Sequence, residues 1–167
     1  RDGRRFGPLP RSWVKYLGLF QNGDRAVIHY QVGDREIHEL PGYVEYGEGS
    51  IYTRTFRIGP GKDDLVLRLA SEASGVNFQL KGSDLASIFN VDGFKCLEIK
   101  ASDESQLLVL GFSNSDDSTI ASLLSNPVDP LSMTKGGPPR FGNRVITTKG
   151  QKGKEEDPFA VDVLTLP

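Results

Sequence analysis

The fold is decided by residues 17–38, which read LGLFQNGDRAVIHYQVGDREIH. Asn22-Gly23 and Gly33-Asp34 are hairpin-turn dipeptides, and each lies between runs rich in β-branched and aromatic residues. A two-residue loop at each dipeptide fixes the strand register, and side chains then alternate between the two faces. One face is predicted to collect Leu17, Leu19, Ala26, Ile28, Tyr30, Val32 and Ile37. The predicted cross-strand pairs are Leu17–Ile28, Leu19–Ala26, Tyr30–Ile37 and Val32–Arg35.

The same register places the only two histidines of the chain on the opposite face. His29 and His38 become direct cross-strand partners, with Gln31 and Glu36 one step along. Their Cβ atoms would lie about 4.5–5.5 Å apart. Both imidazoles could then hold one divalent metal ion with Glu36 as a third ligand. Two alternatives stay open, which are a pair of partly covered histidines on an outer face and a pH-sensing pair.

Beyond this stretch, short strands continue along the chain. Alternating or apolar runs predict strands at residues 51–58, 65–70, 76–80, 94–100 and 106–112. Helical signals are few, with Ser118 as a cap for residues 119–125 and Ser83-Asp84 as a cap for a turn through Phe89. We therefore expect a mainly β fold, an antiparallel, jelly-roll-like β-sandwich with one or two short helices and long Pro/Gly-rich terminal loops.

The length of 167 residues fits a single β-sandwich domain, residues 1–167. Its 19 glycines and 10 prolines indicate many turns. We expect residues 1–12 to be a loop lead-in and residues 126–158 to be irregular. Residues 159–167 would be an extended lead into a following domain, because both ends look cut from a longer protein.

Composition excludes several classes of function. A net charge of −2 argues against a general nucleic-acid binder. The single Cys96 excludes an internal disulfide framework, a cysteine-based metal cluster and a Cys-x-x-Cys-His haem attachment. The sequence contains no apolar run of 18 residues, so it predicts no membrane-spanning segment. A phosphate-binding glycine loop and a Gly-x-Ser-x-Gly elbow are both absent from the sequence, and no carboxylate pair stands out as an acid and base.

Aromatic residues suggest one further kind of site. Exposed aromatic rings could stack on the apolar faces of a sugar, although core packing is the simpler role for most of them. The candidates for such a platform are Trp13, Tyr16, Tyr43, Tyr46 and Tyr52, with Arg140 and Arg144 as candidate polar contacts.

Three stretches carry a resemblance to a known family. They are residues 6–42, from Phe6-Gly7-Pro8-Leu9-Pro10 to Glu39-Leu40-Pro41-Gly42; residues 52–60; and residues 134–167, which close on Pro158-Phe159-Ala160-Val161-Asp162 and Val163-Leu164-Thr165-Leu166-Pro167. Together they resemble an uncharacterised β-rich domain of large exported proteins of the planctomycete and verrucomicrobial type. In those proteins the domain lies before a β-propeller that is similar to glucose/sorbosone dehydrogenases, often with a c-type cytochrome module.

The resemblance implies a context and supplies no catalytic residues. It implies an exported, periplasmic or extracellular protein whose partners are the propeller and cytochrome domains of the same chain, with haem held there and no cofactor in this domain. Our leading hypothesis is a non-catalytic accessory or scaffolding module that helps to present a carbohydrate. The alternatives are a contribution to an oxidoreductase site at the propeller junction, through Arg4, Arg5, Arg140 and Arg144, and a metal- or pH-responsive hairpin at His29 and His38.

Overall fold

The computed structural model describes residues 12–47 and 49–135, all of which belong to one compact unit of the chain. The expected lead-in before Ser12, the closing segment 159–167 and most of the segment 126–158 lie outside the described residues. Arg4, Arg5, Arg140 and Arg144 lie outside them as well. Within the described part, residues 126–135 contain one short 3-10 helix, η2 (Pro130–Met133).

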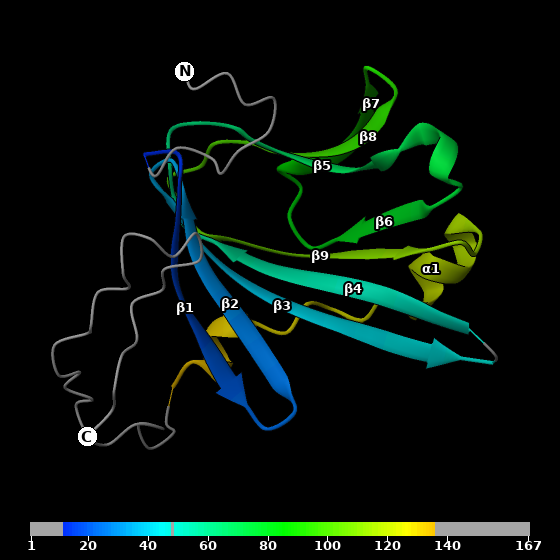
Figure 1. Ribbon diagram of the computed structural model, residues 1–167, viewed down its shortest axis with the longest axis horizontal. Helices are drawn as coiled ribbons and strands as arrows, with labels where there is room; N and C mark the ends of the chain where they lie inside the picture. Colours follow the sequence, from blue (N-terminus) through cyan, green and yellow to red (C-terminus); the bar gives the residue numbers. More distant parts are fainter. Residues whose placement is uncertain (1–11, 48, 136–167) are drawn as a thin grey trace, which may run out of the picture. The chain divides into compact units, whose positions relative to one another are not determined.

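The described chain is mainly β and forms two antiparallel sheets, which confirms the predicted β-sandwich (Figure 1). Its first four strands follow one another as a meander instead of the two Greek keys of a jelly roll, because tight hairpins join them. In spatial order, the six-stranded sheet contains β1 (Val14–Asn22), β2 (Arg25–Val32), β3 (Arg35–Tyr46), β4 (Gly49–Ile58), β9 (Gln106–Ser113) and β6 (Asn77–Lys81). The three-stranded sheet contains β5 (Leu65–Ser71), β8 (Phe94–Ile99) and β7 (Ala86–Val91).

The second hairpin has the predicted register, whereas the first does not. Tyr30 pairs with Ile37, and His29 pairs with His38, as the Gly33-Asp34 turn predicts. In the first hairpin Leu19 pairs with Ile28, so the predicted pairs Leu17–Ile28 and Leu19–Ala26 are wrong.

The cause of this shift lies in the turn and in a bulge. A tight turn of this kind needs a positive φ at its first central residue. Gly23 supplies it with φ 63°, so the loop is Gly23-Asp24 instead of Asn22-Gly23. A bulge between Tyr16 and Gly18 then takes Leu17 out of the ladder, which leaves it 46% exposed. Ile28, Tyr30 and Ile37 nevertheless share one face.

The remaining predicted strands are confirmed as β4, β5, β6, β8 and β9, and the helix is confirmed as α1 (Asp117–Leu123). The cap of α1 is Asp116, whose side chain accepts a hydrogen bond from the Thr119 amide, and not Ser118. Ser83 does cap a short turn, because its hydroxyl accepts a hydrogen bond from the Leu85 amide, but the turn does not reach Phe89, since Ala86–Val91 form β7. Asp92 and Gly93 both have positive φ, which is the geometry of a two-residue hairpin between β7 and β8.

The main core fills the space between the two sheets. Tyr30 and Val32 pack against it, so the apolar face predicted for β2 and β3 faces the smaller sheet. Burial of these side chains is the main source of stability of the fold. The buried members of this core are Ile37, Phe56, Ile58, Leu97, Ile99, Leu108 and Leu110.

The reverse face of the larger sheet, which carries both histidines, is partly covered by the segment that follows β9. Helix α1 packs there over Gly111, where an added Cβ would lie 2.7 Å from Leu124 Cδ2. Farther along, η2 contacts β1, β3 and β4. This cover buries Val27 completely and leaves His38 9% exposed. A second core forms under α1 from Ile51, Val109, Ile120 and Leu124.

A buried arginine ties the two sheets together at one end. Arg35 is fully buried at the start of β3, and burial lowers the pKa of its guanidinium. Its Nε donates to the Gly59 carbonyl, and its Nη1 donates to the Lys100 carbonyl that follows β8. Gly61 has no room for a Cβ, because the Arg35 side chain lies against it. The charged group therefore joins the ends of strands from both sheets.

Among the described residues, no helix is both long and apolar enough to cross a membrane.

Candidate functional site

A ladder of aromatic side chains crosses four strands of the larger sheet at the end where β3 meets β4. Tyr43 pairs with Tyr52, Tyr52 with Phe112, and Phe112 with Phe78, which places all four on the face that carries the main core. Ring centroids are 5.8 Å apart for Tyr52–Phe112 and also for Phe78–Phe112. Tyr43 is 64% exposed and Tyr52 is 56% exposed, so half of the ladder is open to solvent.

A polar network lies directly beside this ladder on the same face. Arg54 donates from Nε and Nη2 to the two carboxylate oxygens of Glu39, at 2.6 and 3.0 Å. The Tyr30 hydroxyl donates to Glu39 Oε2 at 2.9 Å. Burial and the charge of Glu39 raise the pKa of Tyr30 well above its usual value. Burial alone would lower the pKa of Arg54, but the hydrogen bonds and charge of Glu39 raise it.

The inner end of the ladder opens into a cavity between the two sheets. Its volume is about 180 Å³. Arg54 and the two phenylalanines of the ladder line it from the larger sheet, and Leu69 and Ala70 line it from β5. The Arg54 guanidinium also lies over the Phe56 ring, 4.9 Å from its centroid. The site therefore offers exposed aromatic rings, a small, partly open apolar pocket and one charged donor.

The structure does not bring the whole predicted aromatic platform together. Tyr43 and Tyr52 are neighbours, but Tyr46 lies on the reverse face, where it packs against the core under α1 and bonds to the Ser115 hydroxyl. Tyr16 pairs with Tyr30 and is six residues along the sheet from Tyr43, about 20 Å. Trp13 precedes β1 and is 62% exposed.

The two histidines lie together on the reverse face, as predicted. Their rings stack with centroids 4.1 Å apart and planes 13° apart. Glu36 lies diagonally opposite His29, and its Oε1 is 2.5 Å from His29 Nε2. The Phe20 ring lies beside both imidazoles, with centroid distances of 5.9 and 6.3 Å. One donor atom from each of His29, Glu36 and His38 lies within 4.8 Å of the others.

The surroundings of His38 favour its neutral form. Burial lowers the pKa of His38, and the adjacent His29 lowers it further because two charged imidazoles would repel each other. Glu36 and Asp129 act in the opposite direction. Arg57, which pairs with His38 in β4, donates to Asp129 at 3.1 Å, so its charge is compensated.

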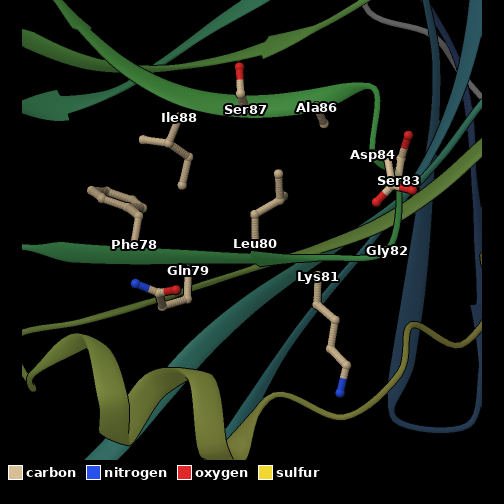
Figure 2. Close-up of a pocket in the computed structure, with 10 residues that line it drawn as sticks. All are labelled: Phe78, Gln79, Leu80, Lys81, Gly82, Ser83, Asp84, Ala86, Ser87 and Ile88. Atoms are coloured by element: carbon tan, nitrogen blue, oxygen red, sulfur yellow. The ribbon is translucent and has the colours of Figure 1, made fainter.

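Two further hollows lie elsewhere on the described part of the chain. One, of about 530 Å³, separates the edge strands β6 and β7; Figure 2 shows Leu80 and Ile88 directed into it, and Lys81 directed away toward α1. The other, of about 660 Å³, lies on the reverse face between the sheet and residues 124–128. Neither joins two exposed aromatic rings to a partly buried ion pair as the ladder site does.

Phe78, Phe112 and Arg54 are site residues that sequence reasoning missed. Each lies in a strand that was expected, but the site depends on β4 pairing with β9 and β9 with β6. These pairings join residues far apart in sequence, so no turn sets their register. The alternation Tyr52-Thr53-Arg54-Thr55-Phe56 was the available signal that an arginine shares a face with two aromatic residues.

Fold and site together define an antiparallel β-sandwich with a partly exposed aromatic ladder on one face of its larger sheet. Residues 1–39 match the sequence profile of a domain of unknown function (DUF6797). The matched residues include β1, β2 and the start of β3. This agrees with the expectation of an uncharacterised domain. No curated protein and no solved structure matches the chain.

Proposed function

We propose that this domain is a non-catalytic binding module for a carbohydrate. The observation that carries the proposal is the pair of exposed phenol rings, Tyr43 and Tyr52, that continues through Phe112 to a small, partly open pocket. Sugars present an apolar ring face and a polar rim of hydroxyl groups. A row of aromatic rings beside a charged hydrogen-bonding group is complementary to both.

The polar rim of the ligand would meet Arg54 and Glu39. The pairing of these two side chains uses Nε and Nη2 of the guanidinium, so Nη1 is not part of it. Arg54 also lines the cavity at the end of the ladder. We infer that Nη1 donates to a sugar hydroxyl there. Because Glu39 neutralises the arginine, the site favours a neutral sugar over an acidic one.

The same network supports a binding role in preference to a catalytic one. Both carboxylate oxygens of Glu39 already accept hydrogen bonds from Arg54, and Oε2 also accepts one from Tyr30. A general base needs a lone pair directed at the substrate. The raised pKa of Tyr30 likewise keeps its hydroxyl protonated near neutral pH.

The wider context of this proposal rests on the family resemblance. In that context the domain is an accessory module of a larger exported, dehydrogenase-like protein. Its partners are a β-propeller and a c-type cytochrome module of the same chain, which would hold the haem. The binding face would then keep a carbohydrate close to the neighbouring oxidoreductase domain.

A glycan array followed by calorimetric titration tests the binding proposal. We expect the 167-residue chain to bind at least one neutral oligosaccharide on the array. Tyr52→Ala should weaken that binding at least about tenfold, which corresponds to about 1.4 kcal/mol, because it removes the central exposed ring. Tyr16→Ala is the matched control, since Tyr16 is also exposed on the same face but lies far from the ladder.

Two results would contradict the proposal. One is the absence of any bound glycan for the folded wild-type chain. The other is an affinity of Tyr52→Ala equal to that of the wild type, or a loss of the same size in Tyr16→Ala. Far-UV circular dichroism of each variant checks that the strands are retained.

A further inference from the structure

The reverse face of the hairpin β2–β3 carries three side chains with metal-binding chemistry, and the carbohydrate site does not use them. His29 and His38 are directly opposite each other, and Glu36 is one step along β3. Two imidazole nitrogens and one carboxylate oxygen are the ligand set of many zinc sites with an open position. The three donor atoms come from a single hairpin whose register a tight turn fixes.

The distances suit a shared ion. Zinc bonds of about 2.0–2.1 Å require donor atoms about 3.3 Å apart in a tetrahedral site. In the structure the donor atoms lie within 4.8 Å of one another. His29 Nε2 and Glu36 Oε1 are in direct hydrogen-bond contact at 2.5 Å and would separate by about 1 Å to share an ion. Rotation of side chains alone can therefore close the site. The nearly parallel rings need only a tilt for both nitrogens to point at one ion.

The burial of the cluster favours a preformed site. The His29 side chain is 15% exposed and His38 is 9% exposed, so packing restricts both rings. The Phe20 ring flanks them. The Glu36 side chain is 57% exposed, which places the carboxylate on the solvent side of the imidazoles. The two imidazole nitrogens would therefore bind an ion from the side of the sheet, and the Glu36 carboxylate oxygen would bind it from the solvent side.

The neighbouring charges do not oppose a cation. The nearest guanidinium is that of Arg57, which pairs with His38 across β3 and β4. Asp129, just before η2, compensates its charge with a contact of 3.1 Å. Glu36 itself adds a negative charge to the cluster. The local field is thus neutral to negative before an ion binds.

We propose that His29, His38 and Glu36 bind one divalent transition-metal ion of the zinc class and leave a coordination position for water or an external ligand. Imidazole favours zinc, copper and nickel, whereas magnesium and calcium prefer sites made only of oxygen. The chain has no other histidine, and its one cysteine, Cys96, is buried in β8. The expected stoichiometry is therefore one ion per chain.

Titration of the tag-free 167-residue chain with Zn²⁺ tests the proposal, with calorimetry as the readout. We expect one bound ion in the wild type, retained in an excess of Mg²⁺. Glu36→Gln and His29→Gln should each weaken the affinity for Zn²⁺ at least about tenfold. Loss of a residue that only hydrogen-bonds to a metal ligand already weakens metal affinity about 10-fold or more, and loss of the ligand itself should cost at least as much. Gln31→Ala is the control, because Gln31 faces Glu36 in the register but is not a ligand.

A second readout locates the ion. The ring resonances of both histidines should shift together in NMR spectra and stop changing at one equivalent of Zn²⁺. Glu36 is exposed, so Glu36→Gln should fold even if a variant at the buried His38 does not. The proposal is overturned if wild type binds no Zn²⁺, if Mg²⁺ displaces it, or if Glu36→Gln and His29→Gln bind like the wild type.

Discussion

Arg54→Ala should lower the free energy of unfolding by about 2–4 kcal/mol, less than the loss of a partner from a fully buried ion pair, because the Arg54 side chain is 28% exposed. The Glu39 side chain is only 9% exposed, and the substitution removes the guanidinium that donates two hydrogen bonds to its carboxylate. It also removes the cation above the Phe56 ring. Urea denaturation of the 167-residue chain, followed by circular dichroism, measures the change.

The double variant Glu39→Leu/Arg54→Leu separates the charge effect from lost packing. Replacement of both members of a buried ion pair by apolar groups is often close to neutral, because no charge is left buried. We expect the double variant to recover part of the loss seen in Arg54→Ala, since the Tyr30 hydroxyl still loses its acceptor, Glu39 Oε2. If the double variant were as unstable as the single one, or Arg54→Ala cost less than about 1 kcal/mol, the pair would not be buried as described.

Leu108→Ala should lower the free energy of unfolding by about 3–5 kcal/mol through a cavity in the main core. Leu108 is fully buried in β9 and belongs to the cluster that joins the two sheets. Its neighbours include Phe56, which pairs with it across β4 and β9. The same denaturation experiment gives the measurement.

Val66→Ala provides the matched control for the core variant. Val66 is in β5 of the smaller sheet, yet it is 60% exposed. Its truncation should change the free energy of unfolding by less than about 0.5 kcal/mol. Similar losses of stability in Leu108→Ala and Val66→Ala would contradict the placement of Leu108 in the core and of Val66 on the solvent-exposed face of β5.

Local sequence signals predicted most of the strands of this fold and the register of one hairpin. Gly33-Asp34 placed His29 opposite His38 because a two-residue loop leaves a single register. In the first hairpin the two-residue loop is Gly23-Asp24, and not Asn22-Gly23 as predicted. The glycine had to occupy the first position of the turn, and a bulge at Leu17 then altered the remaining pairs. Strand β7 was missed although Asp92-Gly93 marks its hairpin.

Features that depend on pairing distant strands were beyond the reach of local signals. The aromatic ladder needs Phe112 beside Tyr52 and Phe78 beside Phe112. The cover on the reverse face could not be predicted from local signals either, because α1 and η2, which follow Ser113, pack on strands far from them in sequence. Sequence alternation shows which side chains share a face, but not which strand lies next to which.

The two faces of the larger sheet therefore carry different chemistry. The inner face has the aromatic ladder and the Glu39–Arg54 pair, beside the core. The reverse face has the stacked imidazoles and Glu36. The two proposals are independent, because a metal at His29 requires no part of the ladder. Both depend on the register of β2, β3 and β4.

Proton–proton nuclear Overhauser spectra of the chain test that register directly. The structure predicts cross-peaks between the ring protons of His29 and His38, and between those of Tyr52 and Phe112. It also predicts that neither imidazole contacts Leu97, which lies in the core on the other side of the sheet. Cross-peaks from either histidine ring to Leu97, with none between the two imidazoles, would contradict the placement of both sites.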